Sequence, residues 1–242
     1  METARRLVED ARTLLVDFDG PLARLFPGSS WAELGDRVRA EAHRLGGPGL
    51  AERLQDEPDH VQCLRLVDEH SPGLLAPLER LVTELELDAA SRVSPRPGAL
   101  DLVDRTLERG ASLAVVTNNT PQVVARVLDR ARPGTSGRLL VVGRSAGRVS
   151  DLKPAPDLLL RAMRLLDARP EDAVFLGDSV TDVQAGRSAG VPVVGVAEDE
   201  GRRQELLEAG TVAAVPGVDA FVVPGGRHAA HPSAGEDRRP RP

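Results

Sequence analysis

The chain has 242 residues, a formal net charge of −6 and 41% hydrophobic residues, which is typical of a globular protein with a sizeable core. It has no tyrosine, one tryptophan and four phenylalanines, so it offers neither a basic surface nor aromatic rings that stack on bases, and we expect no nucleic-acid partner. Its single cysteine, Cys63, excludes an intrachain disulfide, and no apolar run is long enough for a secretory signal or a membrane helix. We therefore expect a cytoplasmic protein, monomeric or homodimeric, that does not bind membranes.

Residues 14–16 predict a strand buried on both faces, because a short apolar run of this kind is typical of the centre of a parallel sheet. A polar segment with the composition of a short helix, residues 2–12, precedes it. Asp17 and Asp19 follow the strand directly, and carboxylates at the edge of a core are costly unless a cation compensates them. We therefore expect a hard metal ion at this strand end; an ordinary Asp-Gly turn is the alternative.

Residues 26–91 predict helices and no strand. Apolar residues recur at helical spacing in three segments that are punctuated by prolines. They are Trp31, Leu34, Val38, Ala42 and Leu45 in the first segment, Val61, Leu64 and Val67 in the second, and Leu74, Leu78, Leu81, Val82 and Leu85 in the third. Such a block is typical of an inserted cap domain, with bounds 23–94, between the two parts of a core domain, 1–22 and 95–223. Helices that simply complete the core are the alternative.

Strands and helices alternate after residue 97. The expected strands are residues 112–116, 139–142, 173–177, 192–197 and 212–215, and the helices between them are residues 98–108, 121–131, 158–166, a short helix ending at 189–190, and 202–209. This alternation predicts an α/β fold, a doubly wound parallel sheet with crossover helices on both faces. Residues 224–242 are rich in Gly, Pro, Arg and His and predict a disordered tail without chemistry.

Polar residues stand at the predicted strand ends, where α/β sheets bind ligands. Thr117 and Asn118 follow one strand, Asp178 follows another, and Asp182 comes one helical turn after Asp178. Lys153 lies before a helix and is the one lysine among 31 basic residues. Because the chain uses arginine wherever arginine is tolerated, its single lysine indicates a position where arginine cannot replace lysine.

These residues resemble, in the same order, the four motifs of the haloacid dehalogenase-like (HAD) superfamily. The motif segments are Asp17-Phe18-Asp19-Gly20, Thr117, Lys153-Pro154 and Gly177-Asp178-Ser179-Val180-Thr181-Asp182. The resemblance implies a Rossmann-like core with a helical C1 cap, of the phosphoglycolate phosphatase-like branch. One departure from the family pattern is Pro21, which removes an N–H group from the first loop.

Roles for these residues follow from phosphoryl-transfer chemistry and from the resemblance. Asp17 is the candidate nucleophile that forms an aspartyl-phosphate, and Asp19 the candidate acid and base. Asp17, Asp178 and the backbone carbonyl of Asp19 are expected to hold Mg²⁺. Phosphate is expected to bind the N–H groups of Phe18, Asp19 and Asn118, the Thr117 hydroxyl and the Lys153 ammonium, with Asp182 orienting Lys153 or a metal-bound water.

The predicted function is that of a Mg²⁺-dependent phosphomonoester hydrolase acting on a small phosphorylated metabolite. Asp19 favours this reaction over dehalogenation, because a halide leaving group needs no proton and dehalogenases of the superfamily typically lack this carboxylate. One alternative is a phosphomutase resembling β-phosphoglucomutase, which shares all four motifs. Another is a binding module with the HAD fold and no catalysis.

Overall fold

The computed structural model describes residues 1–28 and 30–222, so the tail expected over residues 224–242 lies outside it. Within these residues six parallel strands form one sheet in the order β3-β2-β1-β4-β5-β6. The strands are β1 (Thr13–Val16), β2 (Ser112–Val116), β3 (Leu140–Val142), β4 (Ala173–Gly177), β5 (Val193–Val196) and β6 (Ala213–Val215). All of the predicted strands are present, with ends that differ from the prediction by two residues or fewer.

Strand β1 occupies the centre of the sheet, where it pairs with β2 on one side and β4 on the other. The chain runs outward from β1 through β2 to β3, returns to β4, and runs outward again through β5 to β6. The predicted doubly wound topology is therefore confirmed. The order of the strands reverses at the carboxyl ends of β1 and β4, which is where sheets of this kind leave a crevice for a ligand.

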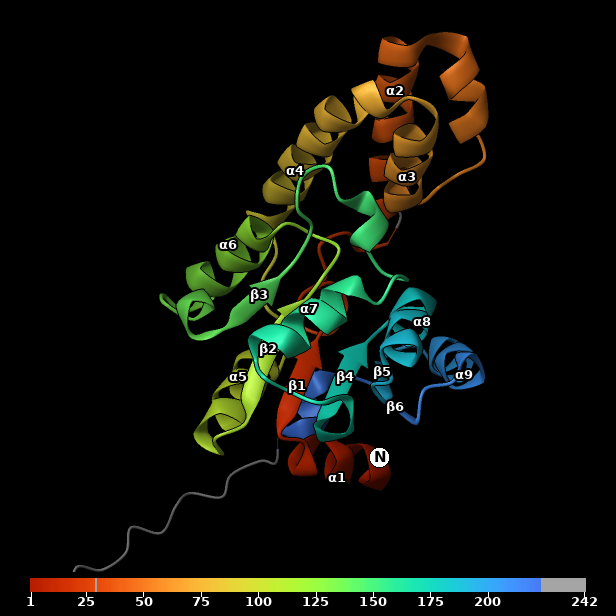
Figure 1. Cartoon of the computed structure of the whole chain (residues 1–242). Helices are drawn as coiled ribbons and strands as arrows, with labels where there is room; N and C mark the ends of the chain where they lie inside the picture. Colours follow the sequence, from red (N-terminus) through yellow and green to blue (C-terminus); the bar gives the residue numbers. More distant parts are fainter. Residues whose placement is uncertain (29, 223–242) are drawn as a thin grey trace, which may run out of the picture.

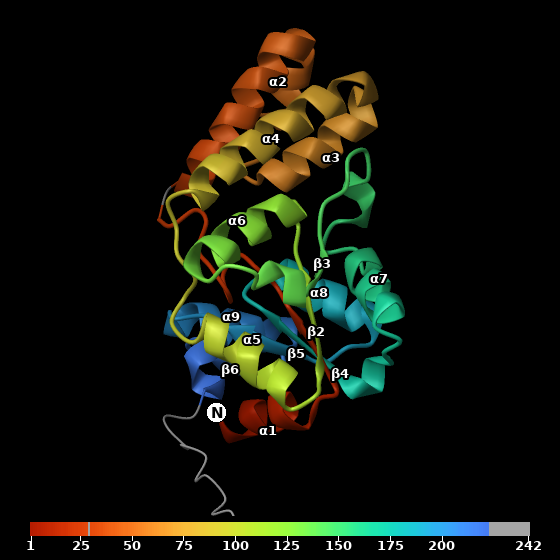
Figure 2. The ribbon, with the colours of Figure 1, turned by 90° about the vertical axis from the view of Figure 1, so that its left-hand side faces the viewer.

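Helices cover both faces of this sheet (Figures 1 and 2). Leu15 faces one apolar core, and Leu14 and Val16 face the other, because successive strand residues point to opposite sides. The helices on the Leu15 face are α7 (Asp157–Leu165), α8 (Val180–Ala189) and α9 (Glu200–Ala209), and those on the other face are α1 (Glu2–Asp10), α5 (Ala99–Glu108) and α6 (Pro121–Ala131).

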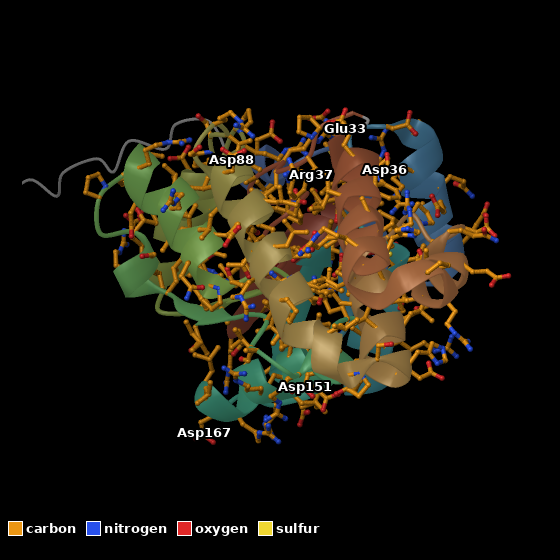
Figure 3. The ribbon with its side chains drawn as sticks, turned by 90° about the horizontal axis from the view of Figure 1, so that it is seen from above. Glu33, Asp36, Arg37, Asp88, Asp151 and Asp167 are labelled. Atoms are coloured by element: carbon orange, nitrogen blue, oxygen red, sulfur yellow. The ribbon has the colours of Figure 1, made fainter. Side chains whose placement is uncertain are left out.

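Three further helices form a separate layer above the carboxyl ends of the strands (Figures 1 and 3). They are α2 (Ser30–Leu54), α3 (His60–His70) and α4 (Leu75–Ala90). Helix α2 is kinked at Gly47, whose φ of 71° is left-handed and which precedes Pro48. Trp31, expected to lie on the apolar face of this helix, is instead 44% exposed. None of the described helices is both long and apolar enough to span a bilayer.

The chain enters and leaves the three-helix layer at one place. Ala23 forms isolated β-bridges with both Asp19 and Pro95, and the Arg96 N–H group donates to the Leu22 carbonyl at 2.8 Å. The two connecting segments therefore lie side by side, next to the residues that follow β1. Below, "helical layer" means α2, α3 and α4.

Candidate active site

Asp17 is held at the carboxyl end of the central strand. Its backbone N–H group donates to the Leu176 carbonyl at 2.8 Å, which extends the pairing of β1 with β4 by one residue. The Phe18 N–H group donates to Asp17 Oδ1 at 2.7 Å, and Asp17 is only 7% exposed. The carboxylate is therefore fixed by the sheet before any ligand arrives. The predicted role of the Phe18 N–H group as a phosphate donor stays a prediction, since in this structure it serves Asp17.

Lys153 joins three of the four motifs. Its Nζ atom lies 2.8 Å from Asp17 Oδ1 and 2.6 Å from Asp182 Oδ1, and the residue is 2% exposed. The ring centre of Phe175 lies 5.6 Å from Nζ, so an aromatic face closes one side of the ammonium. A buried ammonium between two carboxylates is compact and charge-paired, which accounts for a lysine at this position.

Asp182 caps the start of α8 and also forms an ion pair with Lys153. Its Oδ2 atom accepts the N–H groups of Asp178 and Ser179, each at 3.1 Å, and the Ser179 hydroxyl accepts the Asp182 N–H group, which together form a capping box. Its Oδ1 atom faces Lys153. A Cβ atom at Gly177 would lie 2.4 Å from the Asp182 Cβ atom, so the last residue of β4 has to be glycine.

Asp178 packs against the loop that follows β1. A Cβ atom at Gly20, where φ is +100°, would lie 2.1 Å from the Asp178 Cγ atom. The loop is closed by the Gly20 N–H group, which donates to the Ala23 carbonyl at 2.6 Å, and this closure does not use the N–H group that Pro21 lacks. The Asp19 carboxylate accepts the Leu25 N–H group at 2.8 Å. Asp17 and Asp178 thus lie together at one edge of the sheet, and Asp19, in the same loop as Gly20, is near enough for its charge to act on the pKa of Asp178.

The carboxylates of Asp17, Asp178 and Asp182, called the acidic cluster below, fit a hard divalent cation. Carboxylate oxygens of Asp17, Asp178 and Asp182 all lie within 4.8 Å of one another, and oxygen is the ligand that Mg²⁺ prefers. Both carboxylate oxygens of Asp182 are engaged, one by Lys153 and the other by the start of α8, whereas Lys153 and the Phe18 N–H group both use Oδ1 of Asp17. Asp17 and Asp178 are therefore the residues that fit a metal best. Their charges are compensated only in part by the surroundings.

The raised pKa values of the buried carboxyl groups show that the site lacks positive charge. Burial raises the pKa of Asp17 to about 7, although Lys153 acts against the rise. Burial also raises the pKa of Asp19 and of Asp178, and for Asp178 the charges of Asp182 and Asp17 add to the effect. Burial alone would lower the pKa of Lys153, but Asp17 and Asp182 outweigh it, so this pKa is raised and the ammonium stays charged. A divalent cation would bring the carboxyl pKa values down again.

The residues after β2 are tied to the Lys153 loop. The Asn118 side chain donates through Nδ2 to the Lys153 carbonyl at 3.1 Å and accepts the Lys153 N–H group through Oδ1 at 2.8 Å. Thr117 is 1% exposed, and its hydroxyl donates to Asn119 Oδ1 at 3.0 Å. The Thr117 hydroxyl, expected as a phosphate donor, is therefore engaged within the protein in this structure.

The comparison with protein families decides which family this fold and site belong to. A model of the haloacid dehalogenase-like hydrolases matches residues 11–190, a span that contains all four motifs and every candidate site residue. The chain belongs to the haloacid dehalogenase-like hydrolase family. The resemblance that the motifs indicated is thereby confirmed.

Relatives within the HAD family include several phosphatases. Phosphoglycolate phosphatase 1 of Pseudomonas aeruginosa is 29% identical over 182 residues, which are 74% of this chain and 58% of that protein. A phosphoglycolate phosphatase of Rhodospirillum rubrum is 29% identical over 191 residues, or 76% of this chain and 78% of that protein. The match to a phosphoglycolate phosphatase of Pseudomonas putida covers only 36% of that protein. The chain thus matches less than two thirds of the length of some of these relatives.

Solved structures share most of this architecture. CbbY from Rhodobacter sphaeroides, solved in complex with phosphate, superposes with a TM-score of 0.61 and is 25% identical, over 86% of this chain and 95% of that chain. A predicted phosphatase from Clostridium acetobutylicum gives a TM-score of 0.63 at 19% identity, which shows the same fold. The helical layer is therefore part of a fold that other HAD proteins also have.

Proposed function

We propose that this protein is a Mg²⁺-dependent phosphomonoester hydrolase that acts on a small phosphorylated metabolite through an aspartyl-phosphate. The observation that carries the proposal is the placement of Lys153 against Asp17, with Asp178 and Asp19 at the same sheet edge. A carboxylate nucleophile has to meet a phosphate of the same charge, so it needs cations on both sides. Lys153 supplies one cation, and the acidic cluster supplies a place for the other.

The residues support two displacements. In the first, an Asp17 oxygen forms a bond to phosphorus while the bond from phosphorus to the substrate oxygen breaks, and Asp19 gives its proton to that oxygen. In the second, Asp19 removes a proton from a water molecule, which attacks phosphorus, releases inorganic phosphate and restores Asp17. The raised pKa of Asp19 supports a group that holds a proton and gives it up again.

Charge compensation accompanies both displacements. Mg²⁺ held by Asp17, Asp178 and the Asp19 carbonyl would neutralise the phosphate charge and screen the carboxylates from one another. Lys153, oriented by Asp182, faces the transferred phosphoryl group. The N–H groups of Phe18, Asp19 and Asn118 and the Thr117 hydroxyl are the proposed donors to its oxygens.

We also propose that residues 23–94 act as a cap domain over a core of residues 1–22 and 95–223. The paired connecting segments and the position of the helical layer above the strand ends support this division. Arg65 on α3 donates to the carbonyls of Leu152 and Lys153, at 2.5 and 3.0 Å, so the helical layer reaches the lysine loop directly. A cap in this place would exclude water from the phosphoryl group and contact the rest of the substrate.

The relatives support a small phosphorylated substrate. Several are named phosphoglycolate phosphatase, and CbbY from Rhodobacter sphaeroides has been solved with phosphate and, as a variant, with xylulose-1,5-bisphosphate. Small monophosphates and sugar bisphosphates are therefore the compounds to test first.

The proposal is tested by measuring phosphate release from a panel of small phosphomonoesters, with Mg²⁺ and with EDTA. We expect release from at least one compound with Mg²⁺, its loss in EDTA and its recovery when Mg²⁺ is restored. No release from any compound would contradict the proposal and favour a binding module. An aspartyl-phosphate that lasts minutes, together with a need for a bisphosphate, would identify a phosphomutase instead.

A further inference from the structure

A chain of buried hydrogen bonds runs from the helical layer to Thr117. The Thr117 hydroxyl donates to Asn119 Oδ1 at 3.0 Å, and Asn119 Nδ2 donates to Glu86 Oε1 at 3.0 Å. Arg144, in the loop after β3, donates through Nη2 to Glu86 Oε2 at 2.8 Å. Glu86 lies on α4 and is 0% exposed, and Asn119 and Arg144 are 6% and 4% exposed. These direct hydrogen bonds therefore connect α4 to Thr117 of the second motif.

The groups at the Glu86 end of this series of hydrogen bonds determine which atom donates in each of them. A guanidinium has only donors, and a carboxylate with donors on both oxygens has only acceptors. Asn119 must therefore present its NH₂ group to Glu86 and its carbonyl oxygen to Thr117. The Asn119 N–H group donates to the Thr117 oxygen at 3.2 Å, so that oxygen already accepts and the hydroxyl proton points to Asn119.

Arg144 is the group that compensates the Glu86 charge. Burial raises the pKa of Glu86, while Arg144 acts against that rise. His60 lies 3.9 Å from Glu86, but burial and the Arg144 charge lower its pKa to about 3, so it is neutral near pH 7. The Arg144 guanidinium and the Thr120 backbone N–H group can only donate, and both face the Glu86 carboxyl group, so Glu86 is held as a carboxylate.

We infer that Glu86 and Asn119 are positioning residues for the reaction: Glu86 fixes the orientation of the Asn119 amide, and Asn119 holds the Thr117 Oγ1 atom beside the phosphoryl site, where the hydroxyl proton turns from Asn119 Oδ1 to a phosphate oxygen when substrate binds. This inference rests on the proposed function, in which Thr117 binds the phosphoryl group. Because Glu86 belongs to the helical layer and Thr117 to the core, the hydroxyl is fixed only while α4 lies against the loops after β2 and β3. Loss of the Glu86 carboxylate frees the amide to rotate, so the Thr117 side chain loses the hydrogen bond that holds its Oγ1 atom in place.

The test is a double-mutant cycle between Glu86→Gln and Thr117→Val, measured as kcat and KM on the best substrate of the panel. In the wild-type background we expect Glu86→Gln to lower kcat about tenfold, with KM changed by about twofold or less. In the Thr117→Val background the same substitution should lower kcat by about twofold or less, because the hydroxyl that it positions is gone. An equal loss in both backgrounds, or no loss in either, overturns the inference.

Two further variants separate positioning from folding. Glu86→Gln leaves Arg144 buried without its charge partner, so the cycle is repeated with Glu86→Gln combined with Arg144→Met, which removes both charges. The matched control is Glu79→Gln. Glu79 lies two turns earlier on the same helix, is 6% exposed and accepts the Gly147 N–H group at 2.9 Å, so it contacts the same core loop without reaching Asn119. We expect this control to keep kcat within about twofold of wild type.

The two proposals can fail separately. If wild type turns over no phosphomonoester, the proposed function fails, and the same cycle is then measured on the dissociation constant of inorganic phosphate with Mg²⁺, by titration calorimetry. Weaker phosphate binding in Glu86→Gln that disappears in the Thr117→Val background supports the positioning chain. Equal effects in both backgrounds, or no phosphate binding by wild type, overturns it.

Discussion

Replacing Asp17 with asparagine is expected to lower the turnover of a phosphomonoester by on the order of 10⁴-fold or more. Asparagine keeps the shape of the side chain, but its amide does not form the covalent bond to phosphorus and carries no charge for a cation. The pairing of β1 with β4 uses the backbone of residue 17 and is unaffected, so the protein should still fold. The measurement is kcat for wild type and Asp17→Asn, with circular dichroism to confirm the fold.

Asp10→Asn is the matched control for Asp17→Asn. Asp10 ends α1 and is exposed, and α1 lies at the opposite end of the sheet from the helical layer (Figure 1). Its replacement by asparagine should leave kcat unchanged. Turnover of Asp17→Asn within about tenfold of wild type would remove Asp17 from the role of nucleophile.

Lys153→Arg is expected to lose on the order of 10²-fold or more in kcat, although it keeps the positive charge. The Nζ atom already lies at ion-pair distance from two carboxylates and is enclosed by Phe175. A guanidinium is larger and planar, so it displaces either Asp17 or the oxygen of a bound phosphate. The loss should appear mainly in kcat, because the transition state carries the charge that Lys153 compensates.

The matched control is Arg148→Lys, which exchanges the same two residue types at an exposed position. Arg148 lies five residues before Lys153, and its side chain is 64% exposed. Arg148→Lys should therefore leave kcat unchanged. Turnover of Lys153→Arg equal to that of wild type would show that charge alone suffices at residue 153, and the role assigned to the compact ammonium would be wrong.

Most of the fold could be predicted from the sequence, because each element carries its own local signal. The apolar run at residues 14–16 is the central strand, and it is buried on both faces as predicted. Parallel strands bring their carboxyl ends to one edge, so Asp17, Thr117 and Asp178 could be placed near one another without knowing the loops. The position of Lys153 depends on a loop, so no strand pattern placed it, and it was singled out by its rarity in the composition and by the resemblance of Lys153-Pro154 to a family motif.

The buried charges of the helical layer were missed. The prediction for the third helical segment considered its leucines and valines, yet Glu79 and Glu86 share the buried face of α4 with Leu78, Val82 and Ala89. Charges seven residues apart on an apolar face were the available signal. Their partners, Arg144 and the Gly147 N–H group, come from a distant loop whose approach no local pattern encodes.

Sequence patterns also do not show which acceptor a given N–H or hydroxyl group will use. Phe18 and Thr117 were expected to offer open donors to phosphate, but the structure gives the Phe18 N–H group to Asp17 and the Thr117 hydroxyl to Asn119. Both partners stand within two residues in sequence, so such local bonds form readily when no ligand is bound. A phosphate has to compete with them, which makes the orientation of Asn119 relevant to the reaction.

The central claim is that Asp17 carries the phosphoryl group during turnover. Borohydride reduces an aspartyl-phosphate to homoserine, so protein treated with borohydride during turnover, then digested and analysed by mass spectrometry, shows where that bond forms. The account predicts homoserine at residue 17 in wild type with substrate and Mg²⁺, and none without substrate or in Asp17→Asn. Label at another carboxylate, or an unmodified Asp17 in protein trapped during measurable turnover, would contradict it.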